Sequence, residues 1–261
     1  MTQRPFKLSR QDRVRGGGMT SGARMIPVYV VHAKSLADRA ASIEGQLRRA
    51  KFAFEWVTSF DPREITPEIE TQTFAPNRLS PQQKSCALKH VEVFRRIAGR
   101  QQDRALVLED DVLLGQDFAE RLESVLGGIG GRDDSYFASI GAGHGMYTNW
   151  RKLRPGQEIY EATEVRTTDA YIVSRRAAEV YLGWIAAKLL RQPIDHALNT
   201  MNAATGVVVW WVEPPLARQG SLTGRFPSAI AARPHSRLRR YLQFSLTTFR
   251  RRHLKRWLRL S

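Results

Sequence analysis

The sequence predicts an α/β fold, a mostly parallel β-sheet flanked by helices, on three observations. The chain opens in a strand–helix–strand order, with apolar, β-branched segments at 26–31 and 52–57 on either side of a helical segment at 37–50. Residues 105–108 form a continuous apolar run, which is typical of a central strand buried on both faces. The chain has 261 residues, of which 42% are hydrophobic, so it is long enough to bury a sizeable core.

The helix expected at 79–99 has the clearest local signals. Ser80 is placed as its N-cap and Pro81 as its first helical residue. Gln83 completes a Ser-x-x-Gln capping box with Ser80. Gly99 is expected to end the helix, as glycine commonly does.

Shorter patterns predict the remaining elements. The strand at 105–108 is followed by a helix at 118–126, and Ser174 is expected to cap a helix that reaches residue 190. Asp195 is expected to open a short helix. Further strands are expected at 136–140, 170–173 and 207–212, with glycine-rich loops at 127–134 and 141–145.

The net charge of +16 is concentrated in two tails. Residues 1–24 account for +5 of it and residues 233–261 for +10, which leaves +1 for residues 25–232. We therefore expect a disordered basic extension at 1–24, one folded domain at 25–232 and a basic amphipathic tail at 233–261. A nearly neutral body argues against a specific nucleic-acid partner. A basic tail with Leu, Phe and Trp suits an anionic membrane surface, although a solvated disordered tail is the alternative.

Three consecutive acids, Glu109, Asp110 and Asp111, follow the buried strand directly. Their mutual repulsion is unfavourable, and in open α/β sheets the carboxyl ends of strands are where ligands bind. Mg²⁺ and Mn²⁺ prefer carboxylate oxygens, and extended backbone would point Glu109 and Asp111 to the same side. The sequence therefore predicts a metal site at Glu109 and Asp111. The alternative is a solvated turn with helix-capping acids.

Cys86 and His90 are four residues apart on one helix, a spacing that can bind a metal. Two ligands are too few, so a core thiol and a histidine on the polar face are favoured. Cys86 is the single cysteine, which excludes an intrachain disulfide, and no apolar segment follows the basic N-terminus. We therefore expect a cytoplasmic protein.

The acids belong to an ordered set of segments spread over residues 26–230. The set comprises Leu108 to Val112, Asp38-Arg39, Phe60-Asp61, residues 79–90, Ala170 to Ser174, Pro193 to Asp195, and residues 215–219 and 228–230. This set resembles glycosyltransferase family 25, a group of lipopolysaccharide and lipooligosaccharide galactosyltransferases. The chain departs from the family pattern at positions 32–33 and at Gln83, Ser85 and Lys89, where the family usually has Glu, Gly and Ser.

The resemblance implies a GT-A-like fold, a UDP-sugar donor (most often UDP-galactose), Mn²⁺ or Mg²⁺, and inversion at the anomeric carbon. Inversion needs one general base near the acceptor hydroxyl. Asp195 matches the family's Pro-x-Asp and is the first candidate for the base, with a plain N-cap aspartate as the alternative. Asp169 is the reserve candidate.

The resemblance also places residues on the donor side and suggests where the enzyme acts. Arg39, Asp61, His90 and Asp110 are the donor-site candidates, with a surface ion pair as the alternative for Arg39. The expected acceptor is a cell-surface glycolipid or saccharide, reached from the inner face of the cytoplasmic membrane through residues 233–261. The alternatives are a metal-dependent nucleotidyl- or phosphotransferase, a non-catalytic basic protein that binds nucleic acid or membrane, and an inactive relative.

Overall fold

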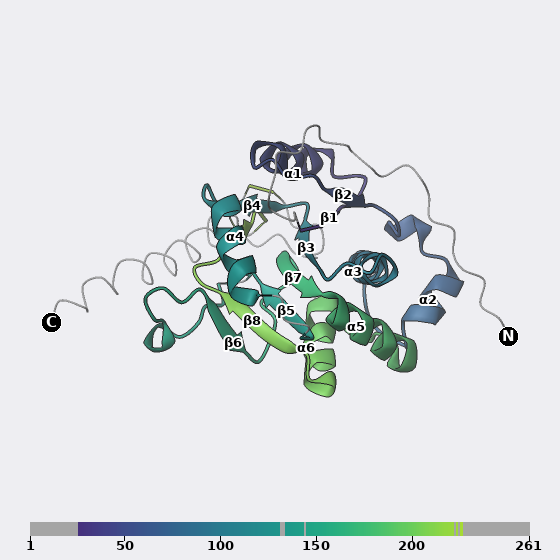
Figure 1. Ribbon diagram of the computed structural model, residues 1–261. Helices are drawn as coiled ribbons and strands as arrows, with labels where there is room; N and C mark the ends of the chain where they lie inside the picture. Colours follow the sequence, from purple (N-terminus) through teal and green to yellow (C-terminus); the bar gives the residue numbers. More distant parts are fainter. Residues whose placement is uncertain (1–25, 131–133, 144, 222, 224, 227–261) are drawn as a thin grey trace.

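The computed structural model describes residues 26–130, 134–143, 145–221, 223 and 225–226 (Figure 1). The extensions expected at 1–24 and 233–261 lie outside these residues. None of the described helices has the length and apolar character needed to cross a membrane.

A seven-stranded sheet forms the centre of the molecule, in the order β2-β1-β3-β7-β5-β8-β6. β7 and β6 run against the other five strands, so the sheet is mostly parallel, as expected, but has an antiparallel strand at its middle. In chain order the strands are β1 (Val28–Val31), β2 (Glu55–Val57), β3 (Arg104–Glu109), β5 (Tyr136–Ser139), β6 (Ile159–Ala162), β7 (Ala170–Ser174) and β8 (Val208–Val212).

Helices cover both faces of this sheet (Figure 1). Along β3, Ala105 and Val107 pack into one apolar cluster and Leu106 and Leu108 into the other, which is the alternation of a strand buried on both faces. The first face carries α3 (Pro81–Gly99), α5 (Arg175–Lys188) and α6 (Ile194–Thr205), and the second carries α1 (Ala37–Arg49) and α4 (Phe118–Ile129). The short helix α2 (Pro67–Thr73) packs beside α5.

The strongest local signals in the sequence are confirmed. Ser80 Oγ accepts a hydrogen bond from Gln83 N at 3.2 Å, and Gln83 Oε1 accepts one from Ser80 N at 2.9 Å, so the capping box of α3 is complete. Ser174 Oγ accepts a hydrogen bond from Ala177 N at 3.2 Å at the start of α5. Caps of this kind need only a few consecutive residues, and they are therefore readable from sequence.

One expectation about the helices is wrong. Helix α4 continues through Gly127 and Gly128 to Ile129, where a flexible loop was expected. The buried side chain of Ile129 extends the apolar face past the glycines, and this packing outweighs a propensity cost of about 1 kcal/mol for each glycine. Helix α6 begins at Ile194, beside Asp195 as expected; its N-cap is Pro193, so Asp195 lies in the first turn and the alternative that it is the cap is wrong.

A second sheet pairs β4 (Val112–Leu114) with β9 (Ala217–Gln219), antiparallel. The pairing brings the segment after β9 back to the turn between β3 and β4, where Gly220 N donates a hydrogen bond to Asp111 O at 2.7 Å. Two short 3₁₀ helices, η1 (Pro62–Glu64) and η2 (Trp150–Lys152), complete the described elements. The strands β4, β6 and β9 and the helix α2 were not expected from the sequence.

Candidate functional site

The expected site residues gather at one edge of the large sheet. β1, β2 and β3 end at this edge, and β7 begins there because it runs in the opposite direction. The residues that precede β7 therefore lie beside the acids that follow β3, and Glu109 N donates a hydrogen bond to Asp169 O at 2.8 Å. The antiparallel strand thus brings Asp169 beside Glu109, the first of the three acids.

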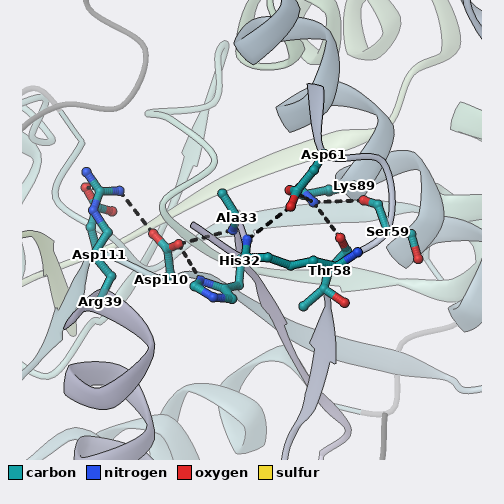
Figure 2. Close-up of polar contacts among 10 residues, drawn as sticks. His32, Ala33, Arg39, Thr58, Ser59, Asp61, Lys89, Asp110 and Asp111 are labelled. Atoms are coloured by element: carbon teal, nitrogen blue, oxygen red, sulfur yellow. Dashed lines mark hydrogen bonds and ion pairs between the residues drawn. The ribbon is translucent and has the colours of Figure 1, made fainter. Parts of the chain in front are cut away.

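Asp110 is buried and is held on both sides by groups of the protein (Figure 2). One carboxylate oxygen lies 2.8 Å from His32 Nδ1, and the other accepts a hydrogen bond from Arg39 Nη1 at 3.0 Å. His32 follows β1 and Arg39 belongs to α1. Asp110 therefore ties the end of β1 and helix α1 to the acidic turn, and the ion pair of Arg39 is buried rather than at the surface.

Asp111 lies in the turn between β3 and β4 and is 2% exposed. Its Oδ2 is 3.7 Å from Arg39 Nη1, whereas its Oδ1 has no hydrogen-bond partner within the described part of the chain. Burial and then the charge of Glu109 raise the pKa of the Asp111 carboxyl to about 7, and the Arg39 guanidinium opposes this rise. A buried carboxylate oxygen without a partner is the kind of group that a hard cation satisfies.

Glu109 contacts a different set of neighbours from Asp111. Thr168 Oγ1 donates a hydrogen bond to Glu109 Oε1 at 2.7 Å, and His90 Nε2 is 3.5 Å from the same oxygen. The backbone at 110–111 is a turn and not the extended backbone that was expected, and the charge of Glu109 still acts on the Asp111 carboxyl. Glu109 contacts His90 of α3, whereas Asp111 contacts Arg39 of α1.

His90 belongs to a three-residue group that the sequence did not reveal. Its side chain is fully buried, so the expectation of a histidine on the polar face is wrong. Ligand atoms of Cys86, His90 and Glu109 all lie within 4.8 Å of one another. Among the described residues, these are the His, Cys, Asp or Glu side chains that come together in a group of three that could hold a metal ion. Asp111 does not belong to this group. Burial, followed by the charges of Glu109 and Asp195, raises the pKa of the Cys86 thiol well above its ordinary value.

Asp169 is buried at the start of β7 and is partly satisfied. The Thr167 hydroxyl donates a hydrogen bond to its Oδ1, and its Oδ2 has no partner among the residues described. Burial raises the pKa of the Asp169 carboxyl to about 6, a rise that the Thr167 hydrogen bond opposes and the charge of Glu109 increases. A Cβ at Gly141 would lie 2.3 Å from this carboxylate, so the close approach needs glycine at that position.

Asp61 is held by a buried lysine (Figure 2). Lys89 Nζ donates to Asp61 Oδ1 at 2.9 Å and to the carbonyl oxygens of Thr58 and Ser59 at 3.0 and 2.8 Å. Lys34 N donates to the other Asp61 oxygen at 3.2 Å. Burial lowers the pKa of Lys89, although the hydrogen bond to Asp61 favours its charged form. These bonds fix the loop after β2 on helix α3.

Asp195 belongs to α6, which packs on the same face of the sheet as α3. It is partly exposed in the first turn of α6, and its Oδ1 accepts a hydrogen bond from His196 N at 2.9 Å. Its charge contributes to the raised pKa of Cys86, which places it within electrostatic reach of that thiol. A partly exposed carboxylate at this position has the access that a base acting on a bound hydroxyl needs.

The arrangement offers two kinds of chemistry at one edge. The turn supplies buried carboxylate oxygens for a hard cation, and Asp195 and Asp169 supply candidate bases. The positioning contacts of His32 and Thr168 were not predicted from the sequence, and Lys89 was noted there only as a departure from a family pattern. The signal for Lys89 was a charged residue on the apolar side of α3, where a lysine needs partners.

Comparisons with known proteins identify a family for the chain. The model of glycosyltransferase family 25 (LPS biosynthesis protein) matches residues 25–198. No curated protein matches the chain significantly. One solved structure that is similar is described as the crystal structure of a glycosyltransferase involved in the glycosylation of the major capsid of PBCV-1. That similarity has 10% sequence identity and a TM-score of 0.45, and it covers 84% of this chain and 98% of the other.

Proposed function

This chain belongs to glycosyltransferase family 25, and from that premise we propose that it is a metal-dependent, inverting enzyme that uses a UDP-sugar. Galactose is the favoured sugar, and a cell-surface glycolipid or polysaccharide is the acceptor. The observation that carries the metal-dependent part is Asp111, a buried carboxylate with one oxygen that has no hydrogen-bond partner among the described residues.

The residues of the acidic turn fit a hard divalent cation, Mn²⁺ or Mg²⁺. Asp111 would hold it through Oδ1, and Glu109 is the second candidate ligand, since its carboxylate is partly exposed at the same edge. When bound, the ion supplies Lewis-acid stabilisation of the charge that develops on the diphosphate leaving group. Asp110 contributes indirectly, because its two oxygens hold His32 and Arg39 beside the turn.

The donor-side candidates keep different roles in this proposal. Arg39 lies against both Asp110 and Asp111, so its positive charge is placed to approach the diphosphate. Asp61 orders the loop after β2 through Lys89 and Lys34, which supports a nucleotide pocket at the ends of β1 and β2.

Inversion requires a base on the acceptor side of the anomeric carbon. We assign this role to Asp195, which would take the proton of the acceptor hydroxyl as the new C–O bond forms and the bond to UDP breaks. Its partial exposure supports the assignment. Asp169 is the reserve candidate, because its pKa of about 6 is near the range of a working base although its carboxylate is buried.

A donor screen tests the proposal. The full chain is incubated with UDP-, GDP- and CMP-sugars and with nucleoside triphosphates, with Mn²⁺ or with a chelator, and the released nucleotide is quantified. We expect UDP release from a UDP-sugar, strongest for UDP-galactose, that disappears with the chelator. Turnover of nucleoside triphosphates without turnover of any sugar nucleotide would contradict the proposal and favour a nucleotidyl- or phosphotransferase.

A further inference from the structure

The group formed by Cys86, His90 and Glu109 has the geometry of a metal site. Cys86 and His90 are one turn apart on α3, and Glu109 comes from the end of β3. Their ligand atoms lie within 4.8 Å of one another, and His90 Nε2 is 3.5 Å from Glu109 Oε1. Ligands of a tetrahedral zinc ion are separated by roughly 3.3–3.6 Å, since the bonds are about 2.0–2.3 Å long. The His90–Glu109 separation is in this range, and the separations from Cys86 Sγ, which are within 4.8 Å, would shorten by up to about 1 Å when an ion binds.

His90 supplies an independent observation that points to a ligand. Its side chain is fully buried, and Nε2 has no hydrogen-bond partner in the part of the chain that the structure describes. Its other ring nitrogen, Nδ1, is 2.8 Å from the hydroxyl of the buried Tyr171. When Nδ1–H donates to that hydroxyl, the lone pair of Nε2 faces Glu109 and is available to a metal. Buried ring nitrogens are seldom left without a partner, so an ion would satisfy this one.

The outer contacts of the group match those of known metal ligands. Thr168 Oγ1 donates a hydrogen bond to Glu109 Oε1 and orients the carboxylate, as Tyr171 orients His90. The Glu109 side chain is 19% exposed, so the group can be reached from solvent on that side. Three protein ligands are typical of zinc sites in which water or a substrate occupies the fourth coordination position.

We propose that Cys86, His90 and Glu109 form a binding site for a borderline-soft divalent ion of the zinc type. The site is distinct from the all-oxygen site at Asp111, because a thiolate and an imidazole select Zn²⁺ or Co²⁺ over Mg²⁺ and Mn²⁺. The two sites share only Glu109. Zn²⁺ is therefore expected to inhibit sugar transfer by engaging Glu109, a consequence that rests on the proposed function, whereas the site itself does not.

The test uses Co²⁺ as a spectroscopic replacement for Zn²⁺ in the full, untagged, metal-free chain. Cys86 is the single cysteine of the protein, so a thiolate-to-cobalt charge-transfer band reports this residue alone. We expect the band to saturate at one equivalent of Co²⁺ and to disappear when Zn²⁺ is added. His90→Gln should weaken Co²⁺ binding at least tenfold, and Tyr171→Phe, which removes the outer contact, should weaken it about 10–100-fold.

Two control variants separate this site from the donor site. His196→Gln removes an exposed histidine on α6, and Asp111→Asn removes the proposed donor-metal ligand. Both should keep the band, and circular dichroism verifies that each variant is folded. Absence of the band in the wild-type chain would overturn the proposal, as would a band that neither His90→Gln nor Tyr171→Phe weakens. A readout of cobalt absorption needs no sugar turnover, so its outcome is independent of the donor screen.

Discussion

Replacing Asp169 by asparagine should make the protein more stable at neutral and alkaline pH. Burial raises the pKa of this carboxyl from 3.8 to about 6, so the folded protein holds the proton more tightly than the unfolded chain does. Its contribution to stability is therefore fully present below about pH 4 and is lost as pH rises through about 6. The difference between the two pKa values corresponds to about 3 kcal/mol, at about 1.4 kcal/mol for each tenfold change. The asparagine of the variant would carry no charge, and its amide oxygen can still accept the Thr167 hydrogen bond.

Urea unfolding of the wild type and Asp169→Asn between pH 4 and pH 8 measures this effect. The quantity of interest is the difference between their free energies of unfolding at each pH, because the other titrating groups are common to both proteins. This difference should grow in favour of the variant from about pH 4 and level off above about pH 7, at up to about 3 kcal/mol. Glu123→Gln, on the exposed side of α4, is the matched control and should show no such rise.

A stability difference that does not change with pH would contradict the raised pKa of Asp169. A less stable Asp169→Asn at pH 8 would also contradict it, since the ionised carboxylate would then have a partner that stabilises it. A gain in stability would indicate that the fold retains a destabilising charge at this edge, which is a common feature of functional sites.

Three further predictions concern the base, the turn and the tail. Asp195→Asn should keep donor affinity and lose about 10²–10⁴-fold in transfer rate, and near-normal transfer would move the base role to the reserve candidate. Gly220→Ala should reduce the free energy of unfolding by about 1–3 kcal/mol, because its Cβ would lie 2.6 Å from Asp111 O; unchanged urea unfolding would contradict this contact. The full chain should float with anionic liposomes and be released by salt, whereas a chain ending at Ala232 should not, since each basic residue of 233–261 contributes about 1 kcal/mol. Equal flotation of the two chains would exclude the tail as an electrostatic anchor.

Local signals allowed much of the fold to be predicted. The capping box of α3 and the Ser174 cap each depend on residues within one helical turn, and both formed as expected. The apolar run at 105–108 also became the buried strand β3. In contrast, β4 and β9 have three residues each and pair across about a hundred residues of chain, so neither segment has a pattern of its own.

The proximity of Thr168 and Asp169 to Glu109 depends on the direction of β7, which the sequence could not predict. In a fully parallel sheet, the residues before this strand would lie at the edge opposite the acids. The antiparallel pairing with β3 instead places Thr168 and Asp169 beside Glu109. Sequence periodicity gives the position of a strand but not its direction, so this proximity was not foreseen. Separately, the end of β3 places Glu109 beside Cys86 and His90, a third partner that their spacing on α3 did not suggest.

Calorimetry of UDP binding in the presence of Mn²⁺ tests the central claim most directly, because it measures the donor metal site without needing the acceptor. The wild type should bind UDP with Mn²⁺ at least tenfold more tightly than with a chelator. Asp111→Asn should lose that difference and remain folded. Asp117→Asn, which changes an exposed residue between β4 and α4, should keep it. Unchanged Mn²⁺-dependent UDP binding by Asp111→Asn would contradict the assignment of the donor metal to the acidic turn.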